Sequence, residues 1–426
     1  MTELAVKSRH TDTPATVVDG LHRVPWIHGL IIGLLSVAWL LTSRQFEVEG
    51  LDPLWSLVFL LAIPYVLLNI WGLSTPRSSH DLPATDHRAV SRLHLCIVTK
   101  GTAPEVVKRS YEKMKHLQND QVKITVVSDH PLEIPHLLVP PEFTTRHARY
   151  KARALEYFRQ QSRLTETEWV LHLDEESIVD EPCLRACLQF CRQSRSLLGQ
   201  GVILYNNHEF WKFPVPTAAD CLRVADDPGR FHLQYALLHK PIFGVHGSFL
   251  LVNGQLEQEI TWDTMDSLVE DYAFAIQCVK RGYSCGEVHG IVREQSPRTV
   301  VDFLRQRRRW ILGIRGLSRY SIWPRFWSWL WTLSPLIKCI VAYRVFLSAK
   351  PALPVIGPVL TSCYLYFYLL GSYVQSADCR APWPVTLRRL VVTLVLFPVS
   401  TLMESLAVAW SLFTRAEKIG FQVVDK

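Results

Sequence analysis

Three consecutive acidic residues follow a short apolar run in the stretch LHLDEES. These residues are Asp174, Glu175 and Glu176. Carboxylates this close raise each other's pKa unless a cation or a hydrogen-bond network takes up the charge. Hard divalent cations prefer carboxylate oxygens and often bridge them to phosphates. The stretch is therefore consistent with a metal–diphosphate site, and the alternative is a solvated acidic loop after a strand.

Three further groups contain side chains that could do chemistry. They are Asp129, the pair Glu270–Asp271, and the set Gln306, Arg309 and Trp310. Each group also has an ordinary structural explanation: a turn-capping aspartate, first-turn acids that complement a helix dipole, and a basic patch on lipid headgroups. A common chemical role requires that the fold bring the groups together.

The segments around these residues alternate between strand-like and helix-like patterns. Residues 93–101 and 122–129 are apolar runs typical of buried strands, and a third strand ends in the acidic stretch. Residues 102–117 and 144–162 have the spacing of amphipathic helices. This alternation predicts an α/β fold with a doubly wound, mostly parallel sheet. Ligands bind at the carboxyl ends of the strands in such sheets, and the first aspartate and the acidic triplet both end predicted strands.

The composition indicates a protein that contacts a membrane. The 426-residue chain has a net charge of +7, a hydrophobic fraction of 48% and 20% charged residues. The charged fraction is below the roughly 25% that is usual for soluble domains. Its length predicts two or three domains of roughly 150 residues each. Because Lys and Arg are spread along the chain or flank apolar segments, we expect a lipid bilayer, and no nucleic acid, as the partner of the positive charge.

Apolar runs near both ends of the chain are long enough to cross a bilayer as helices. They cover residues 26–42, 54–73, 326–347, 352–374 and 390–413. The run at 326–347 contains Pro335, Lys338 and Arg344, and the alternative for it is a segment that lies partly in the interface. The first two are joined by an acidic spacer and flanked by Arg23, Arg77 and Arg88, so the positive-inside rule places the region after residue 74 in the cytoplasm. We expect an integral, multi-pass membrane protein. Its predicted parts are a flexible tail at 1–25, a transmembrane hairpin at 26–73, a linker at 74–90, a cytosolic domain at 91–320, membrane helices at 321–415 and a tail at 416–426.

The cysteines predict no metal site. The chain has ten cysteines, without a CxxC pair or a His/Cys cluster at zinc spacing. Cys183, Cys187 and Cys191 repeat every four residues and so form one stripe of a helix. Core packing explains this stripe better than metal binding. We expect reduced thiols that face the cytosol, because no secretory cleavage pattern is present.

Three charged residues fall within the predicted C-terminal membrane helices. Charges are costly in hydrocarbon and usually face a partner, a cavity or the interface. Glu404 lies in the middle of the last helix. We expect it to pair with Arg344 or Lys338 inside the bundle, and the alternative is a residue that lines a pore.

The order of the chemical groups resembles that of a known enzyme family. A strand-end Asp, an acidic triplet, Glu-Asp and Gln-x-x-Arg-Trp, with membrane helices on both sides, resemble the processive and membrane-bound inverting glycosyltransferases of family two, which include cellulose, hyaluronan and mannan synthases. Further segments resemble the egghead family of membrane β-1,4-mannosyltransferases over roughly residues 53–415. They are VVSDH, RYKARAL, VLHLDEES, GQGVILY, DCLRVADDPGRFHLQYALLHKPIF, HGSF, VEDYAFA and SPRTVVDFLRQRRRW.

The resemblance implies a GT-A-like nucleotide-diphospho-sugar transferase fold flanked by transmembrane α-helices. It also implies roles for single residues. These are Asp271 as the catalytic base; Asp129, Lys151, Arg153, Asp174 and Arg309 as contacts of the nucleotide-sugar; His246, Gly247, Ser248, Gln306 and Trp310 on the acceptor side; and Asp174 and Glu176 as ligands of Mg²⁺ or Mn²⁺. The triplet departs from a strict D-x-D pattern because it ends in Glu176, which leaves open which oxygens bind the metal.

The expected reaction is the transfer of mannose from GDP-mannose, in β-1,4 linkage, to a glycolipid or saccharide acceptor. Inversion needs one base that takes the proton of the acceptor hydroxyl, and Asp271 beside Glu270 in a partly dry cleft could have a suitably raised pKa. One alternative is a processive polysaccharide synthase that uses a UDP-sugar or GDP-mannose. An alternative of another class is a non-catalytic membrane scaffold or transporter, which would have no need for the intact acidic and basic groups.

Overall fold

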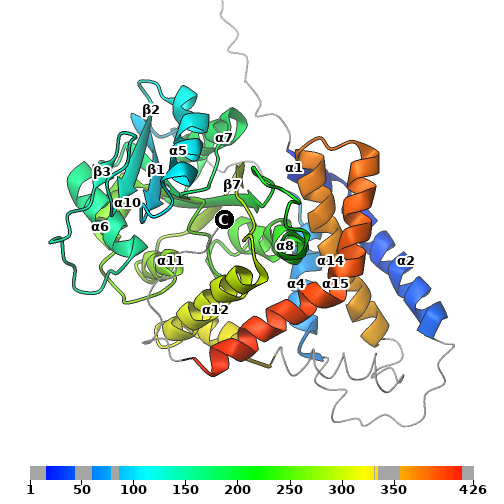
Figure 1. The fold of residues 1–426 in the computed structure, drawn as a ribbon. Coiled ribbons are helices and arrows are strands. Elements are labelled where there is room, and N and C mark those ends of the chain that lie inside the picture. The colour runs from blue at the N-terminus through cyan, green and yellow to red at the C-terminus, as the bar shows by residue number, and fades with distance from the viewer. Residues whose placement is uncertain (1–15, 44–59, 78–85, 331, 334–355, 415–426) are drawn as a thin grey trace, which may run out of the picture.

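A central sheet with helices on both faces lies beside a group of long helices from both ends of the chain (Figure 1). The computed structural model describes residues 16–43, 60–77, 86–330, 332–333 and 356–414. Several predicted segments lie wholly or mostly outside these residues. They are the first part of the N-terminal tail, the acidic spacer, most of the apolar run at 326–347 and the C-terminal tail; of the linker at 74–90, residues 78–85 also lie outside.

The sheet contains seven strands within the described residues, in the order β3-β2-β1-β4-β6-β5-β7. In chain order they are β1 (Arg92–Thr99), β2 (Val122–Ser128), β3 (Leu137–Leu138), β4 (Glu168–Asp174), β5 (Leu198–Leu204), β6 (Leu250–Asn253) and β7 (Cys285–Arg293). All neighbouring pairs are parallel except those of β6, which is antiparallel to β4 and β5. The predicted α/β fold with a mostly parallel sheet is confirmed, and the antiparallel β6 is an addition that the sequence pattern did not predict.

Alternate residues of β1 enter hydrophobic cores on opposite faces of the sheet, as the two-residue period of a strand requires. Leu95 and Ile97 belong to one core, and Cys96 and Val98 belong to the other. The first core includes residues of helices α5 (Pro104–Met114) and α7 (Glu181–Gln193). The second includes residues of α6 (Lys151–Ser162), α10 (Gly254–Ile260) and α11 (Glu270–Lys280). Helices therefore cover both faces, which is the doubly wound arrangement.

The cysteine stripe lies on the buried face of α7. Cys183, Cys187 and Cys191 are each at most 1% exposed and belong to the first core. Their neighbours in that core include Phe190 and Val288. The structure therefore confirms that these cysteines pack in the core.

Helix α6 begins later than the sequence pattern predicted. The expected helix covered 144–162, but α6 starts at Lys151. The carboxylate of Asp263 accepts hydrogen bonds of 2.6–2.9 Å from the backbone N–H groups of residues 146–148. Tyr150, directly before the helix, has a φ of 53°, outside the right-handed helical region. A distant aspartate thus holds this segment as a loop and fixes the point at which the helix begins.

Part of the predicted N-terminal tail is an ordered helix, α1 (Val17–Arg23). Thr16 and Asp19 form a capping box at its start. Val18 is fully buried, and Arg77 forms a 2.6 Å ion pair with Asp19. The predicted tail therefore does not extend through these residues.

Further helices lie beside or below the sheet domain (Figure 1). They are α2 (Trp26–Ser43), α4 (Ile63–Ser74), α8 (Pro214–Asp226), α12 (Val300–Leu317), α14 (Ile356–Asp378) and α15 (Trp383–Leu412). Among the described residues, α15 is long and apolar enough to cross a membrane, and α1 with α2 would add a second span if this pair, bent by 81°, is one segment. Helix α14, expected as a span at 352–374, is buried along much of its length and lies beside α8.

Candidate active site

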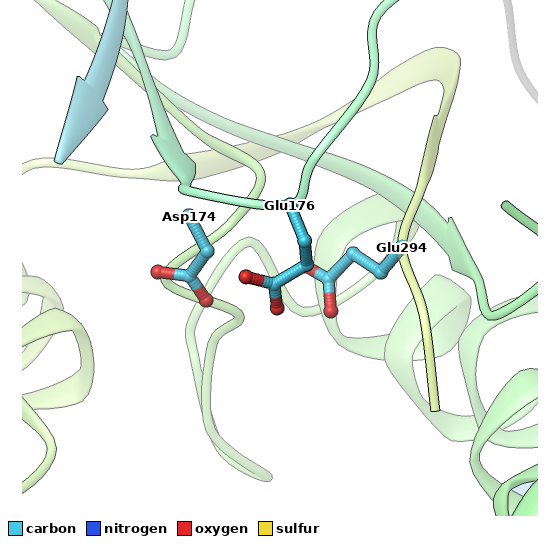
Figure 2. Close-up of side chains that lie close together, drawn as sticks. All are labelled: Asp174, Glu176 and Glu294. Atoms are coloured by element: carbon cyan, nitrogen blue, oxygen red, sulfur yellow. The ribbon is translucent and has the colours of Figure 1, made fainter. Parts of the chain in front are cut away.

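The acidic stretch lies at the carboxyl end of β4, beside the end of β7. Asp174 ends β4, Glu176 follows it, and Glu294 directly follows β7. One carboxylate oxygen from each of these residues lies within 4.8 Å of the other two (Figure 2). Glu176 and Glu294 are 5% and 3% exposed. Converging anionic oxygen donors match the ligand preference of Mg²⁺ and Mn²⁺. The three residues therefore fit a hard divalent cation.

Glu294 was not predicted as a metal ligand. It is a single acid after an apolar strand, and it lies far along the chain from the acidic stretch. The two segments meet because Ile178 and Arg293 exchange backbone hydrogen bonds of 2.9 and 3.0 Å. This antiparallel bridge is a tertiary contact, so no local pattern in the sequence could have identified the third carboxylate.

Glu175, the middle acid, has a different partner from its neighbours. The hydroxyl of Thr99, at the end of β1, donates a hydrogen bond to its carboxylate. The Thr99 hydroxyl in turn accepts a 2.8 Å hydrogen bond from the backbone N–H of Gly101. Glu175 therefore connects the ends of β4 and β1, and it is not one of the three carboxylates of the metal cluster.

Lys151 places a buried ammonium group between the acidic residues of β4 and α11. It is the first residue of α6. Its Nζ donates to the carboxylate of Asp174 and, over 3.1 Å, to the carbonyl oxygen of Gly247, and it lies 3.9 Å from Oε1 of Glu270. Burial disfavours the charged form, but the attraction of Asp174 and Glu270 is stronger, so the pKa of Lys151 is raised. The side chain thus remains a cation at the centre of the site.

Asp271 lies in the first turn of α11, next to Glu270. Burial raises the pKa of Asp271, and repulsion from Glu270 raises it further, to about 7, although Lys151 acts in the opposite direction. A carboxylate with such a pKa is a stronger base than an ordinary aspartate and is still substantially ionised near neutral pH. Its environment therefore suits proton abstraction.

Gly247 lies against both charged groups. A Cβ atom at this position would be 3.1 Å from Oδ2 of Asp271 and 3.3 Å from Nζ of Lys151. Both contacts are tighter than ordinary van der Waals distances, so any side chain here would push the two groups. The predicted acceptor-side glycine is therefore next to the predicted base, and its lack of a side chain leaves room for them.

Asp129 and Arg153 form an ion pair at the neighbouring strand end. Asp129 directly follows β2, and Nη2 of Arg153 lies 2.7 Å from its Oδ1. Arg153 and Lys151 are on the same helix but serve different carboxylates. The predicted nucleotide-sugar residues thus form two adjacent cation–carboxylate pairs.

His246 belongs to a buried hydrogen-bond chain. Its Nδ1 is 2.9 Å from Nη2 of Arg223, and its Nε2 is 2.7 Å from Oδ1 of Asp227. A guanidinium group can only donate, so Nδ1 is the acceptor and Nε2 carries the proton that is donated to Asp227. Asp227 and Arg223 fall within the segment that resembles the egghead family, but no role was predicted for them.

Gln306, Arg309 and Trp310 lie on α12 at the opposite side of the same site. Gln306 is 4% exposed. The guanidinium carbons of Arg223 and Arg307 lie 4.1 and 4.4 Å from the centroid of the Trp310 ring, within the range of cation–π contacts. Trp310 on α12 therefore contacts Arg223 of α8 through a cation–π interaction.

A cavity of about 720 Å³ connects these groups. All the predicted site residues line it except Arg153. They are Asp129, Lys151, Asp174, Glu176, His246, Gly247, Ser248, Asp271, Gln306, Arg309 and Trp310. The cavity continues past the sheet to side chains of α4, α14 and α15, among them Leu360 and Leu402. It therefore has a charged arm at the strand ends and an apolar arm among the outer helices.

Comparisons with known proteins identify a matching family model and similar relatives. Residues 169–411 match the family model described as glycosyl transferase family group 2. The β-1,4-mannosyltransferase bre-3 of Caenorhabditis elegans is 30% identical over 407 residues, which cover 86% of each chain. The β-1,4-mannosyltransferase egh of Drosophila melanogaster is 28% identical over 393 residues, which cover 86% of this chain and 85% of the relative.

Among solved structures, the mannosyltransferase PcManGT from Pyrobaculum calidifontis, in complex with GDP-Man and Mn²⁺, aligns with a TM-score of 0.47 and 13% identity. The alignment covers 88% of this chain and 99% of that protein.

Proposed function

Since this chain belongs to the glycosyl transferase family group 2, we propose that it transfers mannose from GDP-mannose, in β-1,4 linkage, to a glycolipid or saccharide acceptor. The chain is a glycosyltransferase, and its relatives in worm and fly are β-1,4-mannosyltransferases. The proposal rests above all on one observation: Asp271 and the carboxylates of Asp174, Glu176 and Glu294 line one cavity. A base and an acidic cluster that fits a metal are the two parts that this transfer requires.

In the proposed reaction the acceptor hydroxyl attacks the anomeric carbon from the face opposite the diphosphate. The new bond from oxygen to the anomeric carbon forms, the bond to the phosphate oxygen breaks, and GDP leaves with the electron pair. Asp271 takes the proton of the hydroxyl. Lys151 and Arg309 line the same cavity. In this proposal their positive charges stabilise the negative charge that develops on the leaving diphosphate. Inversion needs no covalent intermediate.

Asp174, Glu176 and Glu294 would hold Mg²⁺ or Mn²⁺, which when bound neutralises part of the diphosphate charge. Lys151 then has a second role, because its ammonium group contacts Asp174 and so balances the charge of one ligand. The family membership and the intact set of acids and cations give no support to a non-catalytic scaffold.

We also propose that the protein is a multi-pass membrane protein with a cytosolic catalytic domain. The exposed apolar side chains of α2 and α15 support this. Trp26 and Leu34 on α2 are 66% and 63% exposed, and Val395 and Leu406 on α15 are 69% and 57% exposed. Apolar surface of this extent is unusual for a monomer in water, and a bilayer would cover it.

A donor panel tests the proposed function. The purified full-length enzyme is incubated with Mg²⁺ or Mn²⁺, single nucleotide sugars and a set of saccharide and glycolipid acceptors, and the released nucleotide is measured. We expect GDP from GDP-mannose and no release by the Asp271→Asn variant. UDP from UDP-glucose instead would overturn the donor assignment, and no turnover of any donor would overturn the proposed activity.

A further inference from the structure

The backbone of Glu294, the third carboxylate of the acidic cluster, is held by the segment that follows β5. Its N–H donates a 2.7 Å hydrogen bond to the carbonyl oxygen of Leu204, and its carbonyl oxygen accepts one of 2.9 Å from the N–H of Asn207. The side-chain amide of Asn207 also donates, over 3.2 Å, to the carbonyl oxygen of Glu176. Asn207 therefore contacts the two segments whose glutamates point toward one another in Figure 2.

Arg293, the residue before Glu294, binds two carboxylates from other elements. Its Nε lies 2.7 Å from Oδ2 of Asp378 and its Nη2 lies 2.8 Å from Oδ1, so the two groups form a bidentate pair. Its Nη1 donates, over 2.7 Å, to Oδ2 of Asp180, which caps the start of α7. A planar guanidinium with partners at all three nitrogens has one orientation. Arg293 therefore fixes the backbone from which the Glu294 side chain projects.

Asp378 is the last residue of α14, and its side chain is 8% exposed. Besides Arg293 it binds the side-chain amide of Asn206, which donates to Oδ2 over 2.7 Å. Gln375, one turn earlier on α14, is fully buried and accepts a 2.9 Å hydrogen bond from the backbone N–H of Tyr205. The end of α14 therefore holds the chain where it leaves β5 and where it leaves β7.

Helix α14 is itself fixed against α8. Gly371 packs so closely against the backbone of Cys221 that a Cβ on the glycine would lie 1.9 Å from the Cys221 carbonyl oxygen. Gln375 also donates to Sγ of Cys221 over 3.5 Å. The helix is the one expected as a membrane span at 352–374, and Asp378 lies just beyond that range. A helix predicted as an anchor thus ends in contacts that support the acidic cluster.

A second arginine makes a matching set of contacts at the start of β7. Nε and Nη2 of Arg77 lie 3.0 and 2.7 Å from Oε1 of Glu287, and its Nη1 lies 2.6 Å from Oδ1 of Asp19 on α1. This arginine also ties β7 to an outer helix. However, Glu287 precedes Glu294 by seven residues, which is roughly 20 Å along a strand. Stability alone could be served by either arginine, but only Arg293 adjoins a residue of the acidic cluster.

We propose that Asp378 is a positioning residue for the metal cluster, acting through Arg293 on Glu294. The inference rests on the proposed function, in which this cluster holds Mg²⁺ or Mn²⁺. With Asp378 in place the Glu294 carboxylate is oriented toward the other two carboxylates before a metal binds. Without it the strand end can shift, and part of the binding free energy is lost in restoring the geometry. Helix α14 thereby sets the affinity of the site for metal.

Direct Mn²⁺ binding tests the inference without any turnover. The full-length protein in phosphatidylcholine nanodiscs is titrated with Mn²⁺ alone, and the free ion is measured by electron paramagnetic resonance. The binding that Glu294→Gln weakens defines the cluster. We expect its Kd to rise about tenfold in Asp378→Asn, because the loss of a partner around metal ligands costs about 10–100-fold in affinity. Arg293→Lys keeps the charge but removes the bidentate fork, and should raise the Kd similarly.

Two comparisons separate positioning from stability. Arg77→Lys breaks the matching fork at the start of β7, so it should lower the thermal midpoint about as much as Arg293→Lys but leave the Kd for Mn²⁺ unchanged. The double variant of Arg293→Lys and Asp378→Asn should bind Mn²⁺ about as weakly as the weaker of the two single variants, because both substitutions break the same connection.

An unchanged Kd in both Asp378→Asn and Arg293→Lys would overturn the inference. An equal rise in Arg77→Lys, additive losses in the double variant, or no binding of Mn²⁺ by wild type would also overturn it. Failure of the proposed function looks different, because no donor would then release its nucleotide, while wild type would still bind Mn²⁺ and Asp378→Asn would still weaken that binding.

Discussion

The guanidinium of Arg307 and the carboxylate of Glu404 form an ion pair that joins α12 to α15, with 3.0 Å between Nε and Oε1. Arg307 also donates to the carboxylate of Asp220 on α8 and, over 2.8 Å, to the side-chain oxygen of Gln306. Burial disfavours the charged guanidinium, but Glu404 and Asp220 outweigh this, so the pKa of Arg307 is raised. One cation therefore connects an acid of the last helix to Gln306, which is predicted to lie on the acceptor side of the site.

This pair gives Glu404 a partner that was not predicted from the sequence. We expected Arg344 or Lys338, and both lie outside the described residues. The structure gives Glu404 a cation from α12, which is not among the predicted membrane helices. We expected Glu404 to face a positive charge, and its pairing with Arg307 agrees with this. Glu404 also lines the cavity.

Glu404→Gln should lower the stability of the enzyme more than it changes the choice of acceptor. Removing one partner from a buried charge pair leaves the other uncompensated, and because Glu404 is about a fifth exposed we expect a loss of about 2 kcal/mol. The measurement is the folded yield and the thermal midpoint of the purified protein. Lys108→Gln, which breaks the exposed pair with Glu133, is the control and should change little. Normal yield with altered acceptor use would contradict the prediction.

The activity of the enzyme should rise with pH through the range near 7. In the proposed reaction the acceptor proton goes to ionised Asp271, whose pKa is raised to about 7 by burial and by Glu270. Activity is therefore low where Asp271 is protonated and increases as it ionises. The measurement is kcat/KM for GDP-mannose as a function of pH.

Glu270→Gln should move that pH profile. Without the neighbouring negative charge the pKa of Asp271 falls, so the midpoint should shift to lower pH by roughly one unit. Glu166→Gln, a substitution outside the cavity, serves as the control and should leave the midpoint in place. An unmoved midpoint in Glu270→Gln would show that another group controls the profile.

Two neighbouring acids should respond differently to metal. Glu294→Gln removes a carboxylate of the metal cluster, so the Mn²⁺ concentration for half-maximal activity should rise about tenfold or more. Glu175→Gln, in the acidic stretch itself, changes an acid that is bonded to Thr99, and its metal requirement should remain close to that of wild type. Chelation should abolish the activity of both variants and of wild type. Equal metal dependence in the two variants would exclude Glu294 as a ligand.

Gly247→Ala should reduce turnover without unfolding the protein. Its Cβ would press on Asp271 and Lys151 at 3.1 and 3.3 Å, and displacement of a catalytic group by a fraction of an ångström can cost about tenfold or more in rate. Gly316→Ala places a methyl group where no atom lies within 4 Å and should retain full activity. Wild-type turnover in Gly247→Ala, measured as GDP release, would show that the base has more room than the structure indicates.

The strands and two of the three clustered carboxylates could be predicted because their signals are local. β1, β2 and β4 are continuous apolar runs, as strands buried on both faces must be. Asp174 and Glu176 stand directly after such a run. The position of Asp271 at the start of an apolar helix was predictable from the same kind of local pattern, and its role as the base stays a prediction.

The remaining features depend on contacts between distant segments. Glu294 joins the acidic stretch only through a backbone bridge, and α6 begins at Lys151 because Asp263 binds the preceding loop. The cation that pairs with Glu404 comes from a helix outside the predicted membrane segments. No pattern of spacing or composition encodes these contacts, so only the fold reveals them.

The most direct measurement is the anomeric configuration of the product, followed by proton NMR as wild type and Asp271→Asn act on GDP-mannose, whose mannose is α-linked. We predict a β-linked mannosyl product from wild type and a rate at least about a hundredfold lower in Asp271→Asn, the usual contribution of a general base. An α-linked product, or an Asp271→Asn variant that keeps the wild-type rate, would contradict an inverting mannosyl transfer with Asp271 as its base.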